Sequence, residues 1–366
     1  MRTFNTIIVG GGVIGLTIAR ELNKRGLRDI AVLDKGRIGR EASWAAAGIL
    51  APQVEADRDD EFFRLCYDSN RMYPRLEQEL LQETGIDVEF ERGVLYAGFD
   101  ERESMAFDDR FAWQTRVGLA IERLSSEQIR DLEPDISGDV RCGLLFPEDG
   151  QVENRKLVAA LARYAELNSI HVIEGINVDR IVTDHDRANG VEAGGECFMA
   201  ERVVLATGAW TSLIKLGEST VPIDVRPMRG QMVCYKDPDI HIKHVIYSRS
   251  GYLVPRSDAR LLAGATVEDV GFERATTDEA RSVLEKMAIE IAPALAHETI
   301  AEHWAGFRPY TNDGRPIIGS VPNVDNLFMA TGHFRNGILL APITGKLIAD
   351  AVMGANDSRS IGISPA

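Results

Sequence analysis

A glycine-rich turn near the start of the chain carries the clearest chemical signal. Residues 6–9 form a short apolar run that predicts a buried strand, and Gly10, Gly12 and Gly15 follow it in the spacing G-x-G-x-x-G. The first glycine of this motif permits a tight turn, the second lets a pyrophosphate approach the backbone, and the third lets a helix pack closely on the strand. Asp34 ends the next apolar run, where its carboxylate can accept hydrogen bonds from a ribose. The sequence therefore predicts a dinucleotide site.

The elements that would position this site follow in the expected order. A helix beginning near Ile14 has Ile18 and Leu22 on the same face, ends near Gly26, and leads to a strand at residues 30–33. The start of such a helix offers unpaired N–H groups and a positive dipole end to phosphates. FAD and NAD both use this unit, so the motif alone does not decide between them.

An arginine at a strand-to-helix junction marks a second candidate site. Residues 327–340 read LFMATGHFRNGILL and place Arg335 between two apolar runs, together with two glycines and a histidine. Residues 203–210, VVLATGAW, also put an apolar run before Ala-Thr-Gly. Both stretches have the buried-strand character of the N-terminal unit. We expect all three to belong to one discontinuous dinucleotide-binding domain.

The intervening segments are richer in predicted strands. The dinucleotide-binding domain is predicted to comprise residues 1–85, 146–220 and 306–366, and a β-rich substrate-binding domain to comprise residues 86–145 and 221–305. Further strands are expected at 88–96, 171–173, 178–182, 203–205, 230–235, 251–255, 260–264 and 327–330, and helices at 61–81, 157–167, 278–291 and 338–353.

Composition excludes several classes of protein. The 366 residues carry a net charge of −15 with a pI of about 5.0, whereas a nucleic-acid-binding protein should present a basic face. The four cysteines have neither metal-ligand nor C-x-x-C spacing, which favours free thiols in a reducing compartment, and no metal site is expected. No signal peptide precedes the first glycines, and no run approaches the ~18–20 apolar residues of a membrane span. These features predict a cytoplasmic protein.

Several stretches together resemble the D-amino-acid oxidase superfamily of FAD enzymes, and within it most closely the glycine oxidases of thiamine biosynthesis. The resemblance covers nearly the whole chain and is carried by IIVGGGVIG at 7–15, WAAAGIL at 44–50, VVLATGAW at 203–210, GYLVPR at 251–256, HWAGFRPYTNDGRPIIG at 303–319 and GHFRNGILLAPITG at 332–345. It implies an α/β fold with a Rossmann-type FAD-binding domain, glutathione-reductase-like, and a β-rich α+β substrate domain. It also implies a homo-oligomer, a tetramer in the family.

The resemblance assigns roles to three residues at the reacting end. Arg308, in the W-A-G-x-R-P stretch, matches the arginine that pairs with the substrate carboxylate, and a planar guanidinium suits that role. Tyr252 matches the tyrosine that assists at the carboxylate, and Arg335 matches an arginine near the active site. From the residues alone, Arg308 could equally form a surface ion pair and Tyr252 could be a core aromatic.

A larger set is assigned to the cofactor by the glycine motif and the resemblance together. These residues are Gly10, Gly12, Val13, Ile14, Gly15, Asp34, Lys35, Ala42, Ser43, Ala47, Gly48, Ile49, Val178, Thr207, Gly208, His333, Phe334, Arg335, Asn336, Gly337, Ile338 and Leu339.

The chain also departs from the family pattern. Ile49 and Val267 stand where methionines line the substrate pocket of the family's best-matched member, and Ser250 stands where that member has a histidine. The shape and polarity of the pocket therefore differ, which leaves its preferred substrate open. No cysteine follows Cys234, so the resemblance implies non-covalently bound FAD rather than a C-terminal thioether to the flavin.

The implied reaction is oxidation of glycine or another small amine or D-amino acid, such as sarcosine, D-alanine or D-proline. Hydride transfer to flavin and hydrolysis would give a 2-oxo acid and ammonia, and O₂ would become H₂O₂. Two alternatives stay open at this point. One is a D-amino-acid dehydrogenase that passes electrons to another acceptor, and the other is an NAD-dependent enzyme or a dinucleotide-binding protein without redox activity.

Overall fold

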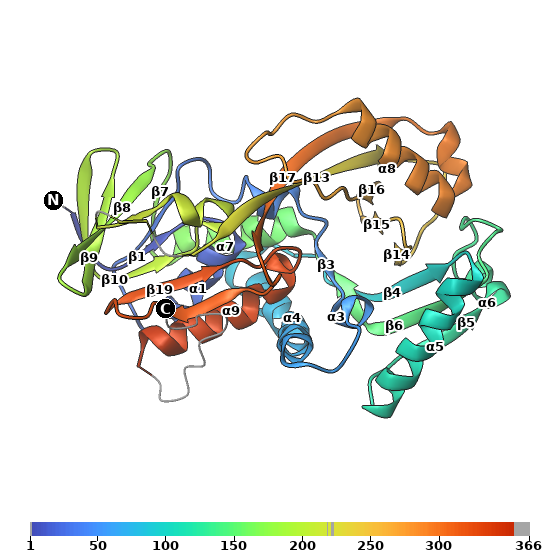
Figure 1. The fold of residues 1–366 in the computed structure, drawn as a ribbon, viewed down its shortest axis with the longest axis horizontal. Helices are drawn as coiled ribbons and strands as arrows, with labels where there is room; N and C mark the ends of the chain where they lie inside the picture. The colour runs from blue at the N-terminus through green and yellow to red at the C-terminus, as the bar shows by residue number, and fades with distance from the viewer. Residues whose placement is uncertain (1, 218, 221–222, 355–366) are drawn as a thin grey trace.

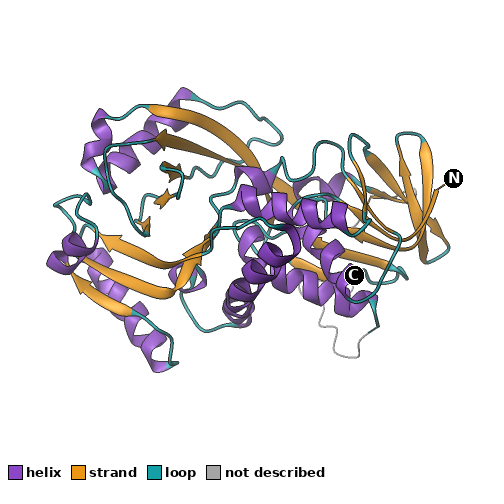
Figure 2. Cartoon of the chain, turned by 180° about the vertical axis from the view of Figure 1, so that it is seen from behind, coloured by secondary structure: helices purple, strands orange, loops and turns teal. Residues whose placement is uncertain are grey.

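The computed structural model describes residues 2–217, 219–220 and 223–354 and contains two large sheets, one in each lobe (Figure 1). The predicted boundary at residue 221 and the predicted domain segment 355–366 lie outside the described residues. One group of helices lies at the centre of the molecule, and others lie on the outside of the lobe drawn on the left (Figure 2). They are α1 (Val13–Lys24), α2 (Ala42–Ala45), α3 (Pro52–Glu55), α4 (Glu61–Thr84), α5 (Glu101–Arg116), α6 (Ser126–Leu132), α7 (Asn154–Leu167), α8 (Asp278–Ile291) and α9 (Gly337–Val352), with short 3₁₀ turns η1 (Gly208–Leu213) and η2 (Pro293–His297).

The first sheet contains the strands predicted for the dinucleotide-binding domain. Its centre is a parallel run in the order β7-β2-β1-β10-β19, which brings the first and last of the described strands to either side of β10. An antiparallel β8-β9-β10 meander extends from β10. The strands of this sheet are β1 (Arg2–Val9), β2 (Ile30–Leu33), β7 (His171–Ile173), β8 (Val178–Asp184), β9 (Arg187–Ala193), β10 (Glu196–Leu205), β11 (Lys215–Leu216), β12 (Ser219–Thr220), β18 (Ile317–Ser320) and β19 (Leu327–Thr331).

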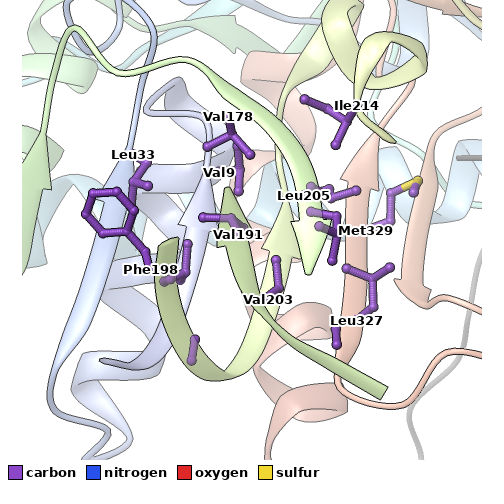
Figure 3. Packing of buried hydrophobic residues seen from close by; sticks show 14 of the residues in the cluster. Val9, Leu33, Val178, Val191, Phe198, Val203, Leu205, Ile214, Leu327 and Met329 are labelled. Carbon is purple, nitrogen blue, oxygen red and sulfur yellow. The ribbon is translucent and has the colours of Figure 1, made fainter. Parts of the chain in front are cut away.

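Strand β1 shows why this sheet is stable. Ile7 and Val9 point into a cluster with residues of β8 and β9, while Ile8, between them, points into a second cluster with α1 and α9. Figure 3 shows the first cluster, with Val9 among its labelled members. Because both faces are covered by apolar layers, the strand is apolar at every one of these positions rather than alternating.

The repeated Ala-Thr-Gly stretches are neighbours in space. Strands β10 and β19 pair in parallel with Leu205 opposite Met329, so the two stretches leave the sheet side by side. The Thr331 hydroxyl donates to the Gly208 carbonyl at 3.0 Å and lies 2.8 Å from the Thr211 hydroxyl. Both stretches therefore follow strands of the sheet that contains β1, and their membership of one dinucleotide-binding domain stays a prediction.

The second sheet forms the other lobe in the order β17-β13-β16-β15-β14-β4-β6-β3, with β5 paired to β6. Its longest pairing joins β13 and β17, which places Met228 opposite Arg308 and Gly230 opposite Gly306. Its strands are β3 (Ile49–Leu50), β4 (Glu91–Gly98), β5 (Glu122–Ser125), β6 (Cys142–Gln151), β13 (Val225–Lys236), β14 (Val245–Tyr247), β15 (Tyr252–Pro255), β16 (Arg260–Gly264) and β17 (Ile300–Thr311).

The α/β fold class with a β-rich second lobe is confirmed. The finer element bounds differ: the strand expected at 88–96 begins at Glu91, and the helix expected at 61–81 continues to Thr84, where Gly85 caps it in the left-handed conformation. The predicted domain borders at 145/146 and 305/306 fall inside β6 and β17, so each of these strands crosses from one predicted domain to the other. None of the described helices has the length and apolar character needed to span a bilayer.

Candidate functional site

One cavity of about 550 Å³ connects the glycine turn to the arginines predicted at the reacting end. Its wall takes residues from both sheets, including Gly10 of the first lobe and Tyr252 of the second. Clefts between lobes and at the carboxyl ends of parallel strands are common ligand sites. The cavity is therefore the candidate active site.

Backbone atoms build the nucleotide end of this cavity. Gly10 has φ of 106°, and a Cβ there would lie 2.3 Å from the Ala206 carbonyl oxygen, so β1 and β10 approach too closely for any side chain. Helix α1 starts after Gly12 with no side-chain cap. The Val13 N–H donates to the Ser43 hydroxyl at 3.0 Å. The N–H groups of the first turn that Ser43 does not occupy, behind a glycine turn, suit a phosphate.

Asp34 also has a structural role that sequence analysis did not predict, because it accepts hydrogen bonds from the backbone of two loops. Its two carboxylate oxygens accept from the Gly11 and Gly36 N–H groups, both at 2.8 Å, which fixes the turn after β2 against the glycine loop. Each carboxylate oxygen has a further lone pair. Its contact with a ribose hydroxyl stays a prediction.

Lys35 and Trp210 close one side of the nucleotide end. The Lys35 ammonium lies 3.5 Å from the centre of the Trp210 ring, and partial burial lowers its pKa. Thr207, Gly208 and Val178 line the cavity nearby. Sequence reasoning missed Trp210 as part of the wall, although it ends the VVLATGAW stretch.

The 332–338 junction forms the middle of the wall. His333 is 3% exposed, its Nε2 lies 3.0 Å from the Thr344 hydroxyl, and burial lowers its pKa to about 3, so the ring is neutral at neutral pH. The Phe334 N–H donates to the Pro309 carbonyl at 2.9 Å, which ties the junction to β17. Helix α9 then begins at Gly337 with no side-chain cap and directs its positive dipole end toward the cavity.

Two of the residues predicted to bind cofactor do not line the cavity. A Cβ on Gly15 would lie 1.9 Å from the Gly10 carbonyl oxygen, so Gly15 allows helix and strand to pack, as the motif predicts. Leu339 is 2% exposed inside the core, and its carbonyl accepts from the Ser69 hydroxyl at 2.6 Å. The other twenty predicted cofactor residues all line the cavity.

Arg308 is an uncompensated cation at the opposite end. Its Nη1 donates to the Thr266 carbonyl at 2.9 Å, and no carboxylate among the described residues forms an ion pair with it. Burial lowers the pKa of Arg308, although a guanidinium stays protonated at neutral pH. Tyr252 lies beside it, and burial raises the pKa of this phenol, partly offset by the charges of Arg308 and Arg335. The reading of Arg308 as a surface ion pair is wrong.

Arg335 behaves differently because it has a partner. Its Nη2 lies 2.7 Å from a Glu55 carboxylate oxygen, and the Glu55 charge raises the pKa of Arg335. The Tyr247 hydroxyl donates to the same Glu55 oxygen at 3.3 Å. Glu55 and Tyr247 line the cavity, yet neither stands in a motif, so sequence reasoning missed them.

The three predicted pocket residues line the same cavity but come from different elements. Ile49 comes from β3, Ser250 from the turn before β15, and Val267 from the loop after β16. Val267 is 57% exposed and Ser250 is also exposed, so they lie at the rim.

The family profile named DAO, FAD dependent oxidoreductase, matches residues 5–351. The chain belongs to this family. It is 33% identical to the glycine oxidase of Pseudomonas aeruginosa over 95% of this chain and 94% of that protein. It is 36% identical to the bifunctional ThiO/ThiG protein of Synechocystis, where it covers 96% of this chain but only 52% of the relative, so it spans about half of that longer protein.

Solved structures agree with this membership. Glycine oxidase from Geobacillus kaustophilus has a TM-score of 0.91 and 33% identity, covering 100% of this DAO-family chain and 97% of that one. Glycine oxidase from Bacillus cereus also gives 0.91, at 29% identity, with 97% and 96% covered. This chain is therefore an FAD-dependent oxidoreductase, and membership of this redox family excludes the non-redox and NAD-dependent alternatives.

The structure has a suitable place for FAD. The glycine turn and the uncapped start of α1 suit a pyrophosphate, and the uncapped start of α9 faces the same cavity farther along. Gly48 has φ of 71°, and a Cβ there would lie 2.1 Å from the Val152 carbonyl oxygen, so the small residues after α2 present bare backbone to the cavity. These features suit a flat, doubly anionic cofactor in this DAO-family site.

Proposed function

We propose that this enzyme oxidises glycine and other small amines or D-amino acids, including sarcosine, D-alanine and D-proline. The observation that carries the proposal is the partly buried guanidinium of Arg308, which has no carboxylate partner among the described residues and lies beside Tyr252 in the cavity that suits FAD. A carboxylate is the group that best compensates such a cation, because it accepts two parallel N–H bonds. With water and O₂, glycine and D-alanine would give a 2-oxo acid, ammonia and H₂O₂. Sarcosine would release methylamine in place of ammonia, and D-proline would give a cyclic imine that keeps its nitrogen.

The protein residues orient the substrate rather than exchange its protons. Arg308 and the Tyr252 hydroxyl would hold the carboxylate, which turns the α-carbon toward the wall formed by 47–49 and 333–338. Bound FAD supplies the hydride acceptor. His333 is buried and hydrogen-bonded to Thr344, and Glu55 is paired with Arg335, so neither is placed as a free base. A substrate that binds with a neutral amine needs none.

The residues that would hold FAD are those lining the cavity from Gly10 to Gly48, with Thr207, Gly208 and the 333–338 junction. All four cysteines are free, and none lines the cavity, which supports non-covalent binding. The names of the ThiO/ThiG relatives support a further proposal, that the imine product supplies the thiazole ring of thiamine. We also propose a cytoplasmic homo-oligomer, a tetramer by resemblance, which size-exclusion chromatography with light scattering would test.

The deciding experiment is an anaerobic bleaching panel on the purified yellow protein with glycine, sarcosine, D-alanine, D-proline and L-amino acids. Bleaching by glycine or the small amines, followed by recovery and H₂O₂ on admitting air, is the expected result. Bleaching without peroxide on reoxidation would indicate a dehydrogenase with another acceptor. No bleaching by any small amino acid would exclude this substrate class.

A further inference from the structure

Apart from Trp44, which packs edge-on against Trp304, the cavity wall at residues 43–48 has few side chains to anchor it. Helix α2 buries none of its residues, and the segment that follows consists of alanines and a glycine. Instead, other segments hold its backbone carbonyl groups. The donors are Asn154 Nδ2 to Ser43 and Trp44 at 2.7 and 3.2 Å, Trp304 Nε1 to Ala45 at 3.1 Å, Arg256 Nη2 to Ala47 at 2.6 Å, and the Val152 N–H to Gly48 at 2.9 Å.

Arg256 is the hub of this arrangement. It follows β15, in the stretch that also carries Tyr252, and is 8% exposed. Besides Ala47, its guanidinium donates to the Gln151 side-chain oxygen at 2.8 Å, the Val152 carbonyl at 3.0 Å and the Asn154 side-chain oxygen at 3.2 Å. One side chain thus connects the substrate lobe, the end of β6 and the cavity wall.

All four acceptors of Arg256 are neutral. Among the described residues no carboxylate forms an ion pair with it, and burial lowers its pKa to about 10, which leaves it charged at neutral pH. The nearby Glu153 carboxylate is instead bonded to Arg260 and to the Lys156 N–H. Buried charges are normally paired because desolvation is costly. Arg256 is an exception, directly behind the bare backbone of Ala47 and Gly48.

We propose that Arg256 is a positioning residue that locks the 43–48 wall in place and sets a positive charge behind it, which favours the negative charge that bound FAD gains on reduction. The proposal rests on FAD occupying this cavity and not on which amine is oxidised. It gives the GYLVPR stretch a second function besides Tyr252. An arginine serves here because only a guanidinium can reach four acceptors while staying charged.

The test measures the midpoint potential of bound FAD and its dissociation constant, with no amine present. Arg256→Met should weaken FAD binding and lower the potential by about 30 mV, which is a tenfold change for a two-electron couple. Arg256→Lys keeps the charge but not the four bonds, so it should weaken FAD binding while leaving the potential close to wild type. Arg260→Met is the matched control, because Asp258 and Glu153 already neutralise that arginine, and it should change neither quantity.

Three outcomes would contradict the proposal. Equal shifts in potential for Arg256→Met and Arg256→Lys would show that the charge is not responsible. Weaker FAD binding in Arg256→Met with an unchanged potential would reduce Arg256 to a structural role. If Arg256→Met does not fold, a fall of about 30 mV in the midpoint potential of Arg256→Lys also contradicts the proposal. None of these outcomes depends on the bleaching panel, so failure of the proposed substrate would be seen separately.

Discussion

The two ends of the cavity are built from different materials. At the nucleotide end, glycines and helix starts present backbone to the ligand. Position 10 must be glycine, because a Cβ there would lie 2.3 Å from the Ala206 carbonyl oxygen. At the substrate end, Arg308, Tyr252 and the Glu55–Arg335 pair present side chains from four separate segments. Binding to backbone depends on room for the ligand to approach it closely, whereas binding to these side chains depends on their charge. Changes of space and of charge should therefore act on different measurements.

The largest effect is expected from filling space at the nucleotide end. Gly10→Ala places a Cβ 2.3 Å from the Ala206 carbonyl oxygen at a φ of 106°, so the turn must open and the protein should be isolated without FAD and without activity. Gly36→Ala is the matched control in the same loop region, since its Cβ would meet only Asp34 at 3.8 Å. FAD content from the visible spectrum measures both. A yellow Gly10→Ala protein would contradict a backbone-built site.

Sequence predicted this end well for a physical reason. A backbone site needs glycines at fixed spacing in one contiguous stretch, so its signature is local, and residues 10–15 and 34 carried it. Arg308 and Tyr252 could be assigned only through longer family stretches. Sequence analysis did not predict Glu55, Tyr247 or the four contacts of Arg256, because each contact joins segments that only the fold brings together.

Removing charge at the substrate end should have the next largest effect. Arg308→Ala deletes the carboxylate clamp, and losing a charge-assisted bidentate pair costs about 3 kcal/mol, or roughly a hundredfold or more in kcat/KM, chiefly through KM. The protein should stay yellow, because the tight contact that shapes the glycine turn is with the Ala206 backbone and not with Arg308. Steady-state kinetics with the best substrate of the panel measure the loss.

The control for this variant is Arg226→Ala, which removes an exposed arginine from the paired strand β13. It should keep both FAD and kinetic constants. Loss of flavin in Arg308→Ala would instead make Arg308 a structural residue and erase the distinction between the two ends.

Adding a methyl group beside Arg308 tests whether the substrate end also depends on space. Gly230 faces Arg308 across the β13–β17 pair, and a Cβ there would lie 2.0 Å from Nη1 and 2.4 Å from Cζ. Gly230→Ala should therefore move the guanidinium without removing it and lower kcat/KM by roughly tenfold, less than Arg308→Ala, since a long side chain can shift. Gly138→Ala, whose Cβ would meet nothing within 4 Å, is the matched control. Unchanged kinetics in Gly230→Ala would mean that kcat/KM does not depend on the position of the guanidinium.

His333 gives the smallest effect at neutral pH and tests whether a side chain in the middle of the wall does chemistry or only packs. Its folded pKa of about 3 lies below the usual value near 6.5, so the unfolded chain binds more protons between those values. The stability contribution is complete above pH ~6.5 and is lost as pH falls toward 3, by up to about 1.4 kcal/mol per pH unit. His333→Gln, which keeps a hydrogen bond within reach of Thr344, should flatten the fall in melting temperature between pH 6 and 4 and leave the pH profile of kcat unchanged between 6 and 9. His185→Gln removes an exposed imidazole and should keep the wild-type slope. A pH profile of kcat that shifts in His333→Gln would make His333 a proton carrier, and the substrate end would then extend into the wall assigned here to the cofactor.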